Sequence, residues 1–132
     1  MDKNKKYQYT QINETATIIE KAGADIDDVR CRMVKYDASG NVVLCGAGEA
    51  PLGVAIITNA SEHKAGDDVD IQIRYNGMIM AGAAFAKGDP LASDANGKAV
   101  KATTGNIIGI ALEAAAGDGA VVHFIMDKGY LA

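Results

Sequence analysis

The sequence lacks tryptophan and contains only two phenylalanines and two prolines. Its apolar residues are mostly Ala, Val and Ile, and they are accompanied by 15 glycines. Small and β-branched residues interrupted by many glycines favour short strands and tight turns over a bundle of long helices. The composition therefore predicts an all-β protein, and 132 residues fit one domain.

A positively charged region and a long hydrophobic run are also missing. The formal net charge is −4, whereas binding of nucleic-acid phosphates requires a clustered basic face. No stretch approaches the roughly 20 apolar residues of a membrane-spanning helix. Residues 1–6 are polar and lack the apolar core of a signal peptide. We therefore expect neither nucleic acid nor membrane as a partner, and synthesis in the cytoplasm.

Cysteine and histidine are too few and too scattered for a metal site. Cys31 and Cys45 each lie in an apolar strand candidate, which predicts buried, reduced thiols. A disulfide between neighbouring strands remains an alternative. His63 lies in a polar loop and His123 in a core strand, and neither has a nucleophile or carboxylate motif nearby.

No group of residues matches a catalytic site. The loop 46–51 has the sequence GAGEAP, but Pro51 replaces the third glycine of a dinucleotide-binding loop and a strand follows in place of a helix. The acidic residues near position 27 lack the following Gly and Glu of an EF-hand and are predicted to form a solvated turn; they are Asp25, Asp27 and Asp28. The sequence predicts no enzyme, no metal and no cofactor.

One segment occurs twice and organises the chain. Asp37-Ala38-Ser39-Gly40 and Asp94-Ala95-Asn96-Gly97 are equivalent turns, each followed by a strand, a loop and a second strand that opens at Gly53 or Gly109. The match predicts one β unit used twice, at about 23–75 and 82–126, within a single domain over residues 22–132. We expect the two copies to close around a shared core.

Apolar periodicity predicts roughly ten short strands, which is typical of a small β-barrel or sandwich. Residues 29–33 alternate with Arg30 and Arg32, which predicts a half-buried strand whose arginines lie on one solvated face. The apolar runs 52–57 and 107–112 predict central strands buried on both faces.

Further predictions concern the links between strands. Asn76-Gly77 lies between two β runs and predicts a hairpin that joins the two copies. A flexible loop over residues 58–68, a helical turn over 113–116 and a short tail over 127–132 are expected as well.

Residues 1–21 are predicted to form an extended N-terminal arm. Alternation in residues 7–12 suits a segment with one face bound, and residues 15–19 are rich in β-formers. Two interpretations stay open: the arm adds edge strands to its own domain, or it reaches a neighbouring molecule.

Three segments carry a resemblance to a known family: residues 44–55, 86–100 and 108–115. The chain resembles bacteriophage capsid decoration proteins, also called cement proteins, and the related base domain of head-fiber proteins. Lys128-Gly129-Tyr130 also resembles the head-fiber pattern. One departure is Asp27-Asp28-Val29, where a Gly-Asp turn such as Gly88-Asp89 is expected.

The resemblance implies a compact β protein on the outside of an icosahedral virion, assembled as a homotrimer that clamps major capsid protein subunits. It brings no catalytic residues. We expect the arm to contact the shell through Tyr7, Tyr9 and Ile12. The alternatives are a carbohydrate- or host-surface-binding module, which the absence of tryptophan disfavours, and a barrel-sandwich carrier or enzyme domain. A carrier requires a modified lysine at a hairpin tip, and Asn76-Gly77 offers none.

Overall fold

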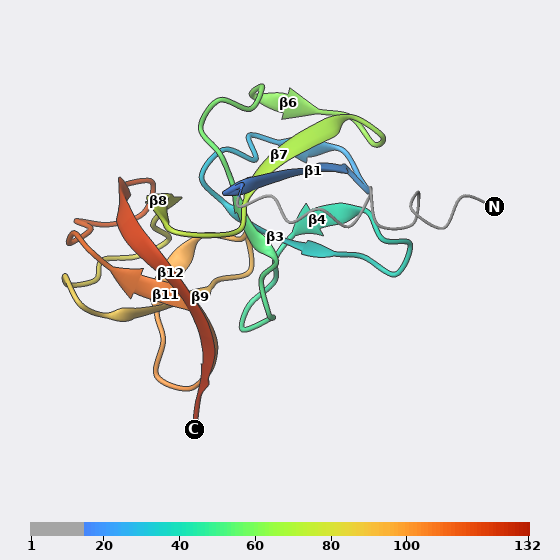
Figure 1. Ribbon diagram of the computed structural model, residues 1–132. Helices are drawn as coiled ribbons and strands as arrows, with labels where there is room; N and C mark the ends of the chain where they lie inside the picture. The colour runs from blue at the N-terminus through green and yellow to red at the C-terminus, as the bar shows by residue number, and fades with distance from the viewer. Residues whose placement is uncertain (1–14) are drawn as a thin grey trace.

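A computed structural model describes residues 15–132 (Figure 1). These residues form twelve β-strands and no helix, which confirms the predicted all-β class. The strands are β1 (Thr17–Lys21), β2 (Ile26–Asp27), β3 (Met33–Tyr36), β4 (Val42–Leu44), β5 (Gly53–Ala55), β6 (Glu62–His63), β7 (Asp68–Gln72), β8 (Asn76–Met80), β9 (Pro90–Ser93), β10 (Ala99–Lys101), β11 (Gly105–Ala111) and β12 (Val121–Leu131).

The strands form two five-stranded sheets and one two-stranded ribbon. The first sheet has the order β1-β7-β5-β3-β4, and the second, in the same sense, has the order β8-β12-β11-β9-β10. All pairs of neighbouring strands are antiparallel. Neither sheet closes fully into a barrel, although a single parallel bridge joins the two edge regions of each sheet.

The two sheets repeat one topology. In each, the first strand pairs with the last, and a parallel bridge follows the first strand: Ala22 to Val42 in one sheet and Ala81 to Ala99 in the other. The ribbon β2·β6 also has a counterpart, the bridge between Phe85 and Ala115. We call residues 17–72 the first unit and residues 76–131 the second unit. We propose that they are the duplicated segments, each beginning with an edge strand that precedes the repeat seen in the sequence.

The two Asp-Ala-x-Gly turns have the predicted geometry. The Oδ1 atom of Asp37 accepts hydrogen bonds from the backbone N–H groups of Ser39 and Asn41, at 2.9 and 3.0 Å. Asp94 does the same for residues 96 and 98, at 2.8 and 2.9 Å. Gly40 and Gly97 take positive φ values of 82° and 74°, which a glycine adopts without steric cost. The repeated turn is therefore a repeated structure.

The core is shared between the units. One cluster lies inside the first unit and includes Val34, Ala55 and Ile71. The larger cluster lies in the second unit, around Ile79, Leu91 and Phe124, but it also contains three residues of the first unit; they are Met33, Cys45 and Val54. The first sheet thus packs one face on its own core and part of its other face on the core of the second unit.

The central strands are placed as predicted. β5 and β11 each lie in the middle of a sheet, and all three residues of β5 are buried. In β5, Val54 joins the core of the second unit while the next residue, Ala55, joins the core of the first. An apolar run without alternation is what burial on both faces requires.

The predicted strand over residues 29–33 is wrong. Residues 30–31 form a turn, and β3 begins only at Met33. Asp28 and Cys31 both have positive φ, 50° and 61°, and the Arg32 N–H donates to the carbonyl of Val29 at 3.1 Å. The apolar members of this alternating segment are nevertheless buried, so the alternation arises from a tight turn that packs against the core. Arg30 and Arg32 do not share a strand face.

The predicted hairpin at Asn76-Gly77 is also wrong. β7 belongs to the first sheet, whereas β8 pairs with β12 in the second. The chain crosses between the sheets here, and Tyr75, with φ 68°, makes the turn. Gly77 is required for space, because a Cβ atom there would collide with the side-chain amide of Gln72. An Asn-Gly pair between two β runs therefore marks a change of sheet in this protein.

Three smaller expectations change. The tail predicted at 127–132 continues β12 to Leu131, paired with the start of β11 after an irregularity. Residues 113–116 form the bridge to Phe85 in place of a helical turn. The loop predicted at 58–68 contains β6 and a buried His63.

Candidate functional site

The predicted shell-contact residues Tyr7, Tyr9 and Ile12 lie outside the described residues. The structure does describe where the arm joins the body. Residues 17–21, which the sequence assigns to the arm, form β1 at the edge of the first sheet. Just before β1, the carbonyl of Ala16 accepts a hydrogen bond from the Ile73 N–H at 2.8 Å. For this part of the arm, the first interpretation holds: it adds an edge strand to its own domain.

A groove lies where the chain crosses between the sheets, next to this junction. It has a volume of about 360 Å³. Its lining consists of Ile73, Arg74, Tyr75, Met126, Asp127 and Lys128. Tyr75 is half exposed, and its carbonyl accepts a hydrogen bond from the Met126 N–H at 2.9 Å. The groove offers an aromatic ring, two cationic groups and one carboxylate, and it lies beside the hydrogen bond between Ile73 and Ala16.

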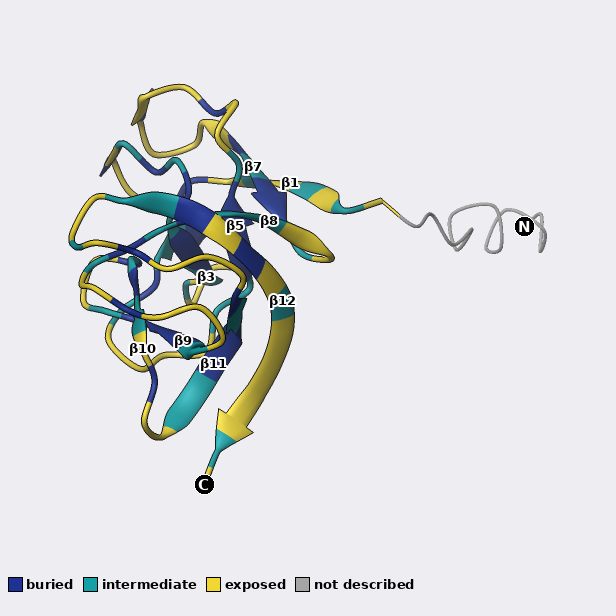
Figure 2. Ribbon diagram, turned by 90° about the vertical axis from the view of Figure 1, so that its left-hand side faces the viewer, coloured by how far each residue is buried: buried dark blue, intermediate teal, exposed yellow. Residues whose placement is uncertain are grey.

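The outer face of the second sheet is largely apolar. Ile110 on β11 lies opposite Ile125 on β12, and Met78 on β8 lies opposite His123. Ile125 is 41 % exposed, while Ile110 and Met78 are partly exposed. Figure 2 shows that β12 alternates between buried and exposed residues in its first part and is mostly exposed toward its C-terminal end. The sequence analysis missed this face, although the unbroken apolar run at 107–112 contained its signal.

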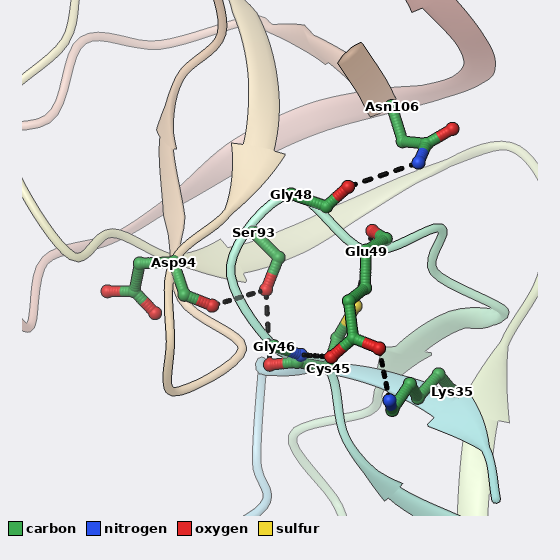
Figure 3. A network of polar contacts seen from close by, with 8 residues as sticks. All are labelled: Lys35, Cys45, Gly46, Gly48, Glu49, Ser93, Asp94 and Asn106. Carbon is green, nitrogen blue, oxygen red and sulfur yellow. Dashed lines mark hydrogen bonds and ion pairs between the residues drawn. The ribbon is translucent and has the colours of Figure 1, made fainter.

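A network of polar contacts joins the two units (Figure 3). The Gly48 N–H donates to the Ser93 carbonyl at 3.0 Å, and the Ser93 hydroxyl lies between two carbonyl acceptors, Asp94 at 2.8 Å and Cys45 at 3.3 Å. The Asn106 amide donates to the Gly48 carbonyl at 3.1 Å. The loop after β4 is thus fixed onto β9 and β11 of the other unit.

Glu49 holds this loop in shape. Its carboxylate accepts a hydrogen bond from the Gly46 N–H at 2.9 Å and pairs with the Lys35 ammonium group. The hydrogen bond from Lys35 lowers the pKa of Glu49 below its ordinary value. The carboxylate therefore stays ionised, and the loop stays closed, to a lower pH than an isolated glutamate would allow.

A second set of contacts surrounds the start of β3. The Met33 N–H donates to the Gly97 carbonyl at 2.7 Å, and the Met80 N–H donates to the Cys31 carbonyl at 2.8 Å. The Arg32 guanidinium donates to the Asn96 carbonyl at 2.9 Å. The same guanidinium also binds the carbonyls of Asp27 and Asp28. Arg32, expected on a solvated strand face, therefore connects the units.

Arg30 has a local partner. Its guanidinium donates to both carboxylate oxygens of Asp28, at 2.7 and 3.2 Å, and this hydrogen bonding lowers the pKa of Asp28. Asp28 occupies the left-handed conformation that aspartate tolerates better than most residues. The residue equivalent to Gly88 is Cys31: its N–H donates to the Ala55 carbonyl as the Gly88 N–H donates to the Ala111 carbonyl, and both residues have positive φ, 61° and 90°.

The two cysteines are buried and free. Cys31 and Cys45 are 2 % and 0 % exposed, and no disulfide joins them. Burial is the main cause that raises the pKa of each thiol. Both thiols are therefore neutral at ordinary pH and pack as small apolar side chains.

Within residues 15–132, Asp25, Asp27, Glu62 and His63 line one pocket at the ribbon β2·β6. No group of three or more His, Cys, Asp and Glu in this range is positioned to hold a metal ion. Asp25 accepts a hydrogen bond at 2.9 Å from the N–H of Ala65, which lies 40 residues away in the sequence. His63 is buried and its Nδ1 has no partner, whereas His123 is exposed on the second sheet. In this range there is also no helix long and apolar enough to cross a membrane.

Two joined β units that present exposed faces and bury their thiols define a scaffold whose parts are held rigidly together. The family model of phage cement proteins matches residues 10–126. The chain therefore belongs to the phage cement protein family, and it is a structural protein of the virion, located on the capsid surface.

A solved structure agrees with this assignment at the level of fold. The chain is similar to "head fiber gp8.5 N base in bacteriophage phi29", with a TM-score of 0.65 and 19 % sequence identity. The match covers 88 % of this chain and 97 % of the solved one. A search of curated protein sequences found no match.

Proposed function

We propose that the protein reinforces a phage head by binding the outer surface of the shell as a homotrimer and bridging neighbouring major capsid subunits. The observation that carries this proposal is the match of the phage cement family over residues 10–126. The fold supports it, because the two units share a core and are joined by backbone hydrogen bonds. Reinforcement requires a stiff joint of this kind and no reactive group.

Trimerisation supplies the affinity. Each subunit offers a modest area to the shell, and one such contact is weak. Three contacts on one rigid trimer act together, because the second and third bind at a high effective concentration once the first has formed. Bridging then follows from geometry, since contacts on different capsid subunits hold those subunits together.

We further propose that the N-terminal arm makes the shell contact through Tyr7, Tyr9 and Ile12. The arm is anchored at Ala16 to the edge of a rigid sheet. Fourteen residues span at most about 50 Å when extended, which reaches well beyond the body of the protein. An extended segment can add a strand to the sheet edge of a capsid subunit, and backbone hydrogen bonds then offset the entropy of ordering it.

Binding to empty heads tests both proposals. We would compare the full chain, a deletion of residues 1–14, and a full-length variant with Tyr7→Ser, Tyr9→Ser and Ile12→Ser by co-sedimentation. The control carries Lys3→Ser, Lys5→Ser and Lys6→Ser, which changes the arm without removing its apolar residues. We expect the first two variants to bind roughly tenfold more weakly or worse, and the control to bind normally.

The outcomes separate the two proposals. If the deletion binds as well as the full chain, the arm is not the contact, and the protein binds the shell through another face. If the full chain itself fails to bind heads, the proposed function is wrong. Binding to a glycan array with no binding to heads would support the host-surface alternative instead.

A further inference from the structure

The face of the first sheet that packs on the second unit has a counterpart in the second sheet. Register pairs Met33 with Val54, and Val54 with Gln72, across three strands of the first sheet. The same positions in the second sheet are Pro90, Ile110 and Ile125, which are paired in the same way. The duplication therefore gives each unit an equivalent face at an equivalent place.

The two faces differ in what covers them. Met33 and Val54 are 0 % and 1 % exposed, because the second unit lies on them. In the second sheet Pro90 and Ile110 are partly exposed and Ile125 is 41 % exposed. The first unit thus has a partner on this face, and the second unit has none within the chain described.

At its margin, the open face of the second sheet is also more apolar than the equivalent face of the first sheet. In the first sheet Lys21 and Asp68 form an ion pair at 2.6 Å, and Asp70 follows on the same face of β7. The register places Met80, Val121 and His123 at these positions in the second sheet. Charged residues in one copy are replaced by Met, Val and His in the other; of these three, Met80 and Val121 line a pocket with Cys31 and Ile57 of the first unit, and His123 is exposed. Apolar residues at positions open to water indicate a surface that is covered in the assembled state.

The part of the second unit that packs on the first sheet has an equivalent in the first unit, and this equivalent is uncovered. The first face is met by Ser93 and the turn that ends at Gly97, whose carbonyl accepts from the Met33 N–H. A Cβ atom on Gly97 would lie 2.6 Å from the Met33 carbonyl oxygen, whereas one on Gly40 would have no atom within 4 Å. Ser93 is 4 % exposed, while Tyr36 at the equivalent position is 45 % exposed. Each chain therefore has one open face and one open turn.

We propose that the outer face of the second sheet, centred on Ile110 and Ile125, binds Tyr36 and the Asp37–Gly40 turn of a second copy of this chain. The contact repeats between molecules the packing that joins the two units within one molecule. It uses different surfaces on the two partners, so it is a head-to-tail contact that forms a ring when the rotation closes. This inference rests on the proposed homotrimer and supplies its interface.

The contact between molecules differs from the one within the chain in two ways. Pro90 stands where Met33 donates its N–H to Gly97, so this hydrogen bond has no counterpart. Tyr36 replaces the smaller Ser93, so its ring adds apolar area. The interface therefore depends on apolar burial, and a single charge at its centre is expected to weaken it strongly.

Self-association measured by size-exclusion chromatography with light scattering tests the inference. We would substitute Ile125→Glu on the face, Tyr36→Glu beside the turn, and Ile19→Glu as the matched control on the exposed edge strand of the first sheet. Ile19 is 63 % exposed, so the control adds the same charge to another exposed isoleucine. We expect the first two variants to associate roughly tenfold more weakly or worse and the control to associate like the wild type.

Mixing separates head-to-tail binding from other arrangements. Ile125→Glu retains an intact turn, and Tyr36→Glu retains an intact face, so an equal mixture can form one productive contact. We expect a dimer containing one molecule of each variant. A mixture that stays monomeric would overturn the head-to-tail contact.

Folding and shell binding complete the test. Far-ultraviolet circular dichroism checks each variant, and Ile110→Thr with Ile125→Thr, which keeps β-branched residues, replaces Ile125→Glu if that variant unfolds. Wild-type association of a folded face variant would overturn the inference. If such a variant also lost binding to empty heads while keeping wild-type association, the face would contact the shell, and the proposed function would stand without this interface.

Discussion

At the scale of single residues, Gly40 and Gly97 occupy equivalent turns but different surroundings. Both have the positive φ that an L-residue adopts at a cost, and both end an Asp-capped turn. Gly97 is buried against the backbone of Met33, and Gly40 is exposed. The duplication therefore provides an internal control: the conformational cost of positive φ is the same at both glycines, and only the packing around them differs.

We predict that Gly40→Ala lowers the free energy of unfolding by about 1 kcal/mol, because alanine strains the left-handed conformation. Gly97→Ala has the same strain and must also displace the Met33 carbonyl, which lies 2.6 Å from the new Cβ atom. We expect a loss of roughly 3 kcal/mol or more, in the range of overpacked core sites. Urea unfolding followed by circular dichroism measures both. Equal losses would show that the turn of the second unit is not locked by the first.

At the scale of elements, the crossing between β7 and β8 is held by one side chain. The Gln72 amide donates to the carbonyls of Arg74 and Asn76, at 2.6 and 2.8 Å, and fills the space beside Gly77. The segment between the sheets is thus turned by a glutamine that belongs to the first sheet. A long flexible linker is absent at this point of the described chain.

We predict that Gly77→Ala lowers the free energy of unfolding by about 2 kcal/mol, because the new methyl group displaces the Gln72 amide from its two hydrogen bonds. Gln72→Ala should cost a similar amount for the same reason. The double variant should cost no more than Gln72→Ala alone, because the displaced group is already gone.

Chemical denaturation of the two single variants and the double variant measures this coupling. Gly117→Ala is the control, since a Cβ atom there has no atom within 4 Å. Strict additivity of the two substitutions would contradict the assigned role of Gln72.

Local patterns in the sequence predicted some elements well and others poorly. The runs 52–57 and 107–112 contain the central strands β5 and β11; β5 is buried on both faces, whereas β11 leaves Ile110 partly exposed on its outer face. The turns at 37–40 and 94–97 followed from side-chain bonds that are local. Asn76-Gly77 misled because the choice between a hairpin and a change of sheet depends on the distant partner β12.

The candidate surfaces show the same limit. The apolar character of Ile110 and Ile125 is visible in the sequence, but a core position and an open face look alike there. Only the register, which places Ile110 opposite Ile125 and equivalent to the covered Val54, separates the two. Arg32 was likewise interpreted as solvated, because alternation carries no information about the carbonyl of Asn96, which lies 64 residues away in the sequence.

At the scale of the whole molecule, the two units share packing and backbone hydrogen bonds. Three residues of the first unit complete the core of the second, and backbone hydrogen bonds connect residues 31–33 and 48 with 80, 93 and 97. Removing apolar volume at this joint should therefore affect both units together.

We predict that Met33→Ala lowers the free energy of unfolding by about 2–5 kcal/mol, because it leaves a cavity where the two units meet. Unfolding should remain a single transition in calorimetry and in circular dichroism. Ile19→Ala, at an exposed position, is the control and should change stability by no more than about 0.5 kcal/mol. Two separated transitions in the Met33 variant would show that the units fold independently.

The shared core also has a consequence for synthesis on the ribosome. Each unit closes by pairing its first strand with its last, so the first unit can fold as soon as β7 has emerged. Its residues Met33, Cys45 and Val54 then face water until the second unit has been translated and folded over them. The nascent chain therefore passes through a stage in which an apolar face is exposed to water, and chaperone binding should be strongest during translation of the second half.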